Sequence, residues 1–189
     1  AYFYIDTYKQ AEMSRDEVLA LTVLNAMLVE TWGSRIYGTA REKGLIYYLN
    51  SSADRGKDYT SWWFGSQISE KQLQPFLDLL IAELLRIKKG LLKESELAAA
   101  KMYLTGSHMR SAQTVNSLAN GYAGTYFYEG RVNDFYSKFP VRVKKVTKQD
   151  IISAARKMFE DRVWGLGFLG TISEESRTKA HKQLAQLWK

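Results

Sequence analysis

The chain has 189 residues, of which 46% are hydrophobic and 25% are charged, and its formal net charge is +7. At this length roughly 70% of the unfolded surface is buried on folding, so one domain can hold a core without a disulfide or a structural metal. The lack of cysteine excludes disulfide scaffolds, thiol nucleophiles and iron–sulfur clusters. His108 and His181 lie far apart in the sequence, and this spacing argues against a self-contained zinc hydrolase.

Hydrophobic periodicity predicts both strands and helices. Two helix starts carry the pattern of a capping box, Ser14 with Glu17 and Ser69 with Gln72. The expected strands cover residues 2–8, 45–50, 59–68 and 164–169, with the second and third joined as a hairpin. The expected helices cover residues 14–29, 34–42, 69–90, 94–111, 114–128 and 147–159, and a last one opens at residue 173.

This order of elements predicts an α+β fold, in which a mostly antiparallel sheet carries helices on one face. No linker-like stretch interrupts the chain, so residues 1–189 are expected to form a single domain. The longest nearly apolar stretch, residues 19–29, is too short for the ~20 residues of a membrane-spanning helix, and we expect no membrane span. The chain opens on Ala1 with a strand-like segment, so we expect it to be part of a longer protein, and its compartment is left open.

Candidate binding residues gather where the short helix meets the next predicted strand. Arg41 offers five fixed hydrogen-bond donors, and Tyr47 or Tyr48 offers a hydroxyl, a combination suited to a carbonyl oxygen or a carboxylate. The structural alternative is that Arg41 only complements the end of a helix and that the tyrosines only pack on the sheet. Spacing alone leaves both interpretations open.

Several short motifs here resemble the pitrilysin/insulinase family of metallopeptidases, which includes the mitochondrial processing peptidases. The matching motifs are Ser34-Arg-Ile-Tyr, Arg41-Glu-Lys, Gly44-Leu-Ile-Tyr, Glu96-Leu with Ala100-Lys101, and Val146-Thr147 with Asp150. They occur in the order and at the intervals of that family, over roughly residues 19–170. The resemblance implies a two-layer fold like that of LuxS and the processing peptidases.

In that family two homologous domains face each other across a chamber, and one of them carries a zinc motif, His-x-x-Glu-His. This chain lacks the motif and resembles the other, inactive half, whose Arg and Tyr reach toward the bound peptide. The resemblance assigns Arg41 to the arginine. One residue fewer separates the two motifs here than in the family, so the tyrosine is Tyr47 or Tyr48, and we favour Tyr47.

The resemblance therefore implies a domain with no catalytic residue, metal or cofactor of its own. It would complete the substrate chamber and bind peptide through Arg41 with Tyr47 or Tyr48. Zinc is expected in a partner His-x-x-Glu-His domain, in the same chain or another subunit, and no nucleic acid is expected. Two alternatives remain: a structural or assembly subunit of the same fold without proteolysis, and a basic module that binds peptide or nucleic acid.

Overall fold

The computed structural model describes residues 1–130 and 135–188, and these form a four-stranded antiparallel sheet with helices. The strands are β1 (Tyr2–Lys9), β2 (Asn50–Arg55), β3 (Thr60–Gln67) and β4 (Val163–Leu169), in the order β2-β3-β1-β4. The helices are α1 (Arg15–Val29), α2 (Tyr37–Glu42), α3 (Glu70–Lys88), α4 (Glu94–Ser111), α5 (Val115–Glu129), α6 (Phe135–Lys145), α7 (Lys148–Met158) and α8 (Glu174–Leu184), and a 3₁₀ turn covers Ala185–Trp188. The predicted α+β class is confirmed.

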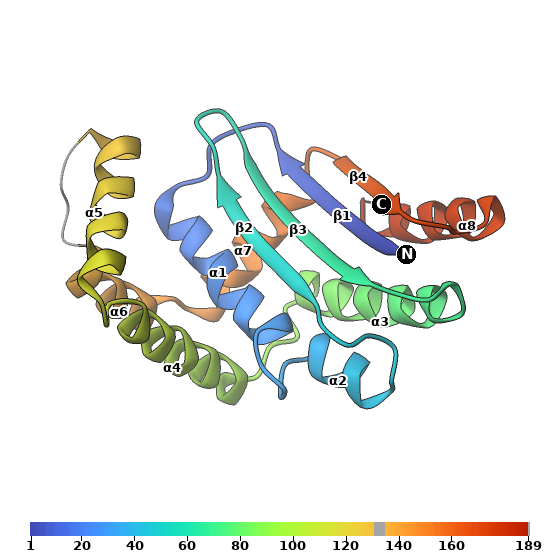
Figure 1. The fold of residues 1–189 in the computed structure, drawn as a ribbon, viewed down its shortest axis with the longest axis horizontal. Coiled ribbons are helices and arrows are strands. Elements are labelled where there is room, and N and C mark those ends of the chain that lie inside the picture. The colour runs from blue at the N-terminus through green and yellow to red at the C-terminus, as the bar shows by residue number, and fades with distance from the viewer. Residues whose placement is uncertain (131–134, 189) are drawn as a thin grey trace.

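The two faces of the sheet differ in their cover. Because strand side chains alternate, Phe3, Ile5 and Thr7 of β1 are buried on the helix side, where the ring centroid of Phe3 lies 5.1 Å from that of Phe76 in α3. Helix α1 packs against β2, and α7 packs against β1 and β3, while α4 and α6 lie farther out beyond α1 (Figure 1). We call the opposite side the open face; on it lie Tyr2, Tyr4, Asp6 and Tyr8 of β1, Trp63 and Gly65 of β3, and Gly165 and Gly167 of β4.

One of the two predicted capping boxes is present. The Ser14 hydroxyl oxygen accepts a bond from the Glu17 N–H at 3.2 Å, and the Ser14 N–H donates to the Glu17 carboxylate at 2.8 Å. The box predicted for Ser69 and Gln72 is wrong. The Ser69 hydroxyl donates to the Gln72 side-chain oxygen, and the Gln72 amide donates to the Gly44 carbonyl at 2.5 Å, so neither side chain caps the helix backbone.

Three further differences concern where elements begin and which elements are present. The short helix begins at Tyr37 rather than residue 34, and the strand expected over residues 45–50 is wrong, because β2 begins only at Asn50. The hairpin itself is confirmed, since β2 pairs antiparallel with β3. Helix α6 was not predicted; it contains Pro140, a residue that normally interrupts helices.

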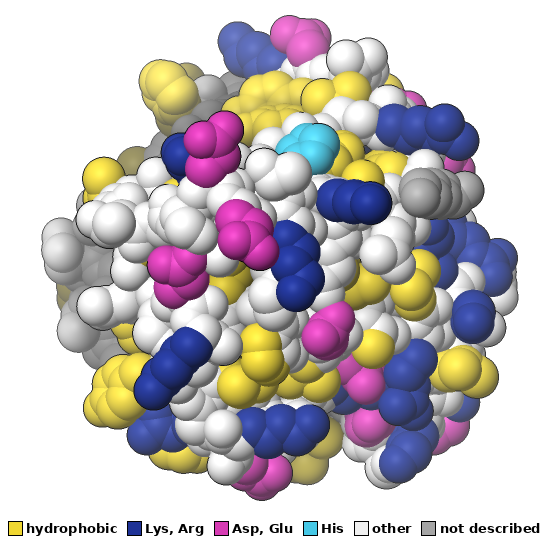
Figure 2. Space-filling view, turned by 90° about the vertical axis from the view of Figure 1, so that its right-hand side faces the viewer, with side chains coloured by type: hydrophobic (Ala, Val, Ile, Leu, Met, Phe, Trp, Pro, Cys, Tyr) yellow, Lys and Arg dark blue, Asp and Glu magenta, His cyan; other side chains and the backbone are white. Residues whose placement is uncertain are grey.

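The surface of the molecule mixes both signs of charge. Figure 2 shows the face at the α8 end, where basic and acidic side chains are interspersed with hydrophobic ones. Within the described part of the chain, no helix combines the length and the apolar character needed to cross a membrane. Although the net charge is +7, the face seen in Figure 2 is therefore not uniformly basic.

Candidate functional site

The candidate site lies in the connection between α2 and β2. Arg41 stands in the last turn of α2, and the chain then reverses at Gly44, whose φ of 64° favours glycine. The Leu45 N–H donates to the Ala40 carbonyl at 2.8 Å, which closes the end of the helix. Residues 45–49 continue as irregular backbone, so Tyr47 belongs to a loop and not to a strand.

The Arg41 guanidinium contacts two exposed aromatic rings. Its central carbon lies 4.2 Å from the centroid of the Trp32 ring and 4.6 Å from that of the Tyr47 ring. One guanidinium N–H also donates to the Tyr47 carbonyl at 2.5 Å. Trp32 and Tyr47 are 68% and 76% exposed, so the cation is held on the surface by stacking and by one hydrogen bond. Arg41 has five donors, and among the described residues this is the one hydrogen bond recorded for its side chain.

Arg41 and Tyr47 line the same hollow, which has a volume of about 660 Å³. Its wall also includes Ile46, Ile68 and Gln72, so it lies between the loop and the beginning of α3. The hollow thus combines a fixed cation, an exposed phenol and apolar side chains. This is a composition suited to an extended peptide, which offers both carbonyl oxygens and side chains.

Tyr48 lies in a different place. Its side chain is half-buried and lines a separate hollow of about 380 Å³, together with Tyr37 and Trp63. The Tyr48 carbonyl accepts a hydrogen bond from the Ser66 hydroxyl of β3. The structure therefore brings Arg41 and Tyr47 together and separates Tyr48 from them.

Trp32 is the member of this cluster that the sequence analysis missed. It lies just after α1, and no periodicity marks it, because it belongs to a turn. Tyr37 was missed as well; its hydroxyl donates to the Tyr47 carbonyl at 3.5 Å, and its ring centroid lies 6.2 Å from that of Trp32. The signal available in the sequence was that two aromatic residues, Trp32 and Tyr37, stand on either side of Arg35.

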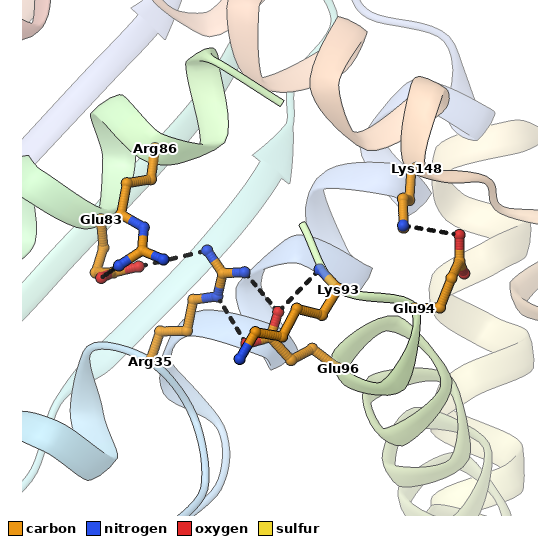
Figure 3. Close-up of polar contacts among 7 residues, drawn as sticks. All are labelled: Arg35, Glu83, Arg86, Lys93, Glu94, Glu96 and Lys148. Carbon is orange, nitrogen blue, oxygen red and sulfur yellow. Dashed lines mark hydrogen bonds and ion pairs between the residues drawn. The ribbon is translucent and has the colours of Figure 1, made fainter. Parts of the chain in front are cut away.

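A second arginine of the same segment has a structural role. Arg35 precedes α2, and its guanidinium bonds Glu96 of α4 and Glu83 of α3 (Figure 3). The side chains of Arg35 and Glu83 are only 10% and 13% exposed. Burial raises the pKa of the Glu96 carboxyl, but the bonds from Arg35 and from the Lys93 N–H outweigh this and leave the pKa below its ordinary value. Arg35 thus ties the segment that carries Arg41 to two helices.

Comparison with known proteins identifies the family. Residues 7–104 match the family described as the peptidase M16 inactive domain. The chain belongs to this family. No curated protein matches it. This match confirms the resemblance to insulinase-type metallopeptidases that the sequence motifs indicated.

Solved structures share the fold of the M16 inactive domain. A protease from Helicobacter pylori is 18% identical, with a TM-score of 0.70 over 87% of this chain and 39% of that one. The inactive peptidase domain of a candidate zinc protease from Bordetella parapertussis is 14% identical, with a TM-score of 0.69 over 92% of this chain and 96% of that one. A chain of complex III2 from Candida albicans is 13% identical, with a TM-score of 0.73 over 95% of this chain and 46% of that one. The chain thus spans less than half the length of the first and third of these neighbours.

The described residues of this M16 inactive domain contain no group of side chains that could hold a zinc ion. Across residues 1–130 and 135–188, no three histidine, aspartate or glutamate side chains come together in a group that could hold a metal ion. A catalytic zinc takes three protein ligands and keeps one open position. The family is described as an inactive domain, which agrees with the lack of three such ligands among the described residues. We therefore assign no step of zinc chemistry to these residues.

Proposed function

We propose that this chain is the inactive half of an insulinase-like zinc metallopeptidase, which completes the substrate chamber and binds peptide while a partner domain holds the zinc. The observation that carries the proposal is that Arg41 and Tyr47 line one hollow. Family membership supports the pairing with a catalytic domain. Whether that domain lies in the same chain or in another subunit does not alter the role of this one.

The chemistry of the two residues fits peptide binding near a scissile bond. Hydrolysis of an amide develops negative charge on the carbonyl oxygen, and donors placed at that oxygen lower the barrier. Arg41 is held by the Trp32 ring and the Tyr47 carbonyl, so its remaining donors are oriented before substrate arrives. The exposed Tyr47 hydroxyl can donate to the same oxygen or to the next carbonyl along the peptide.

The proposal is tested by recombining the chain with its zinc-bearing partner. The isolated chain should bind no stoichiometric zinc and cleave no peptide, whereas the complex should cleave. In the complex, Arg41→Ala should lower kcat/KM at least tenfold, because a charge-assisted hydrogen bond contributes about 1.5–3 kcal/mol and about 1.4 kcal/mol corresponds to a factor of ten. Lys43→Ala is the matched control: its side chain is exposed, it lies outside the lining of the hollow, and it should leave kcat/KM unchanged.

Two outcomes would contradict the proposal. One tightly held zinc ion per isolated chain, measured by metal analysis, would place the metal in this domain. An unchanged rate for Arg41→Ala would make Arg41 a surface residue without contact to the substrate.

A structural or assembly subunit of the same fold is the second candidate function. It is favoured by the similarity to a chain of complex III2, which extends over 95% of this chain. If this alternative holds, the chain binds its partner stably, yet no zinc-bearing partner cleaves peptide in its presence. Cleavage of peptide by the recombined complex would favour the peptidase role, and its absence would favour the structural or assembly role.

A further inference from the structure

A second candidate site lies on the open face of the sheet, at Asp6 in the middle of β1. Asp6 is only 7% exposed, and although its carboxylate is bonded by the Tyr8 hydroxyl, its Oδ1 atom is buried without a hydrogen-bond partner. Burying a carboxylate oxygen without a partner is costly, so such an atom requires an explanation. The cost is offset if a ligand with positive charge completes the site.

The neighbours of Asp6 on this face form a three-sided aromatic frame. Tyr4 and Tyr8 lie two positions away along β1, and Trp63 of β3 is the cross-strand partner of Asp6. On the other side the cross-strand partner is Gly165 of β4, which has no side chain. A Cβ atom placed on Gly165 would meet no other atom within 4 Å, so the frame is open on that side.

The aromatic frame is ordered by its own contacts. The rings of Tyr4 and Trp63 stack at a centroid distance of 5.0 Å and an interplanar angle of 18°. The Trp63 indole N–H donates to the Asp54 carboxylate of β2 at 3.2 Å. A hydrogen bond to Asp6 raises the pKa of the Tyr8 hydroxyl to about 12, so Tyr8 stays protonated as a donor. The ring faces and the carboxylate therefore keep fixed positions around the opening.

The charge of this region is opposite to that of the whole chain. The net charge is +7, yet the charge of Asp54, whose carboxylate accepts from the Trp63 indole, acts here on Asp6. Among the residues that the structure describes, neither has a lysine, arginine or histidine partner within 4.0 Å. Burial raises the pKa of Asp6 even though bonds from the Tyr8 hydroxyl and the Thr7 backbone lower it, and the nearby charge of Asp54 adds to the rise; a bound cation would relieve this environment.

We propose that Asp6, Tyr4, Tyr8 and Trp63 form a subsite for the cationic side chain of an arginine or lysine in a bound peptide. A carboxylate with a free oxygen pairs with guanidinium or ammonium, and aromatic faces attract the same cations. The open side at Gly165 provides the entry. The inference rests on the proposed function, since it names a class of residue in the peptide that the chamber would bind.

The test compares charged and neutral peptides on the assembled peptidase. Two peptides differ only in one residue, arginine or its uncharged isostere citrulline, and kcat/KM is measured for each. The arginine peptide should be preferred at least tenfold. Asp6→Asn, which keeps the shape of the side chain, should reduce the preference below threefold.

Two further variants keep the result interpretable. Gly165→Leu should also abolish the preference, because the added side chain fills the open side of the frame without a clash at Cβ, and it leaves Asp6 intact. Asp161→Asn is the matched control; that carboxylate pairs with Lys9, away from the frame, and the preference should be retained.

The outcomes separate this inference from the proposed function. If the wild-type complex cleaves both peptides equally, or if Asp6→Asn and Gly165→Leu retain the preference, the subsite is refuted. The proposed function still stands in that case if Arg41→Ala lowers kcat/KM. If Arg41→Ala has no effect either, the proposed function fails as well.

Discussion

The guanidinium of Arg35 binds both oxygens of the Glu96 carboxylate, from Nε to Oε1 at 3.1 Å and from Nη2 to Oε2 at 2.5 Å. The third nitrogen of Arg35 bonds Glu83 at 3.4 Å, so one cation joins α3 and α4 to the segment before α2. Planar two-point pairing of this kind fixes orientation as well as distance. The candidate site depends on this support, because Arg41 follows Arg35 in the same segment.

Arg35→Ala should lower the free energy of unfolding by about 3 kcal/mol, because it removes a buried cation from Glu96 and leaves the exposed Arg86 as the cationic partner of Glu83. Urea denaturation followed by circular dichroism measures the loss. Arg86→Ala serves as the control. Arg86 pairs with the same Glu83 but is 54% exposed, so its loss should cost less than about 1 kcal/mol. Equal losses for the two variants would contradict the structural role of Arg35.

Trp32→Ala should lower kcat/KM of the assembled peptidase about two- to fivefold, because an exposed cation–π contact contributes about 0.5–1 kcal/mol. Trp32→Phe should restore most of the rate, since a ring face remains available to Arg41. The effect should disappear when Arg41 is already replaced by alanine, because Trp32 acts through that cation. If adding Trp32→Ala to Arg41→Ala lowers kcat/KM by the same factor as in the wild type, Trp32 acts independently of Arg41.

Ser14→Ala should destabilise the chain by about 1 kcal/mol, the typical cost of losing a helix cap. Ser69→Ala should cost less than half as much, because the Ser69 side chain makes no bond to the helix backbone. Thermal unfolding of both variants under the same conditions gives the comparison. Equal destabilisation would mean that Ser69 caps α3 after all.

The contact of Glu17 with Lys157 predicts a pH dependence of stability. A side-chain bond from Lys157, together with bonds from Ser14, holds the pKa of the Glu17 carboxyl below its ordinary value of 4.5. The stabilisation is therefore present above pH 4.5 and is lost as the pH falls through the lower pKa of the folded state. Lys157→Ala should make the decline in stability below pH 4.5 shallower in a series of urea titrations. An identical decline in both proteins would contradict the prediction.

The sequence was sufficient for most helices and for the hairpin of β2 and β3. Polar caps specify helix starts locally: the Thr147 hydroxyl accepts from the Asp150 N–H as its pattern predicts, and α4 covers the residues expected of it. Alternation also accounts for the core face of β1, since Phe3 and Ile5 lie on the same face and both are buried. These features depend on residues close together in the chain.

The failures lie where distant groups decide the local backbone. Residues 45–49 look like a strand, but the Tyr47 carbonyl is bonded by Arg41 and the Tyr48 carbonyl by the Ser66 hydroxyl, so these groups are not available for strand pairing. Gln72 does not cap α3, because its amide is bonded to Gly44. The spacing of residues in the sequence does not reveal such contacts. The same reason explains why the sequence pointed to Arg41 but not to Trp32.

The position of β1 in the sheet has a consequence for biosynthesis. The first strand of the chain is central, and its two neighbours, β3 and β4, come from residues 60–67 and 163–169. Its second edge therefore stays unpaired until β4 has been made, and such late, long-range pairing is slow. A product truncated before β4 would expose that edge as a template for other strands. Chains terminated before β4 should accordingly self-associate through β1, whereas chains that include β4 have both edges of β1 paired.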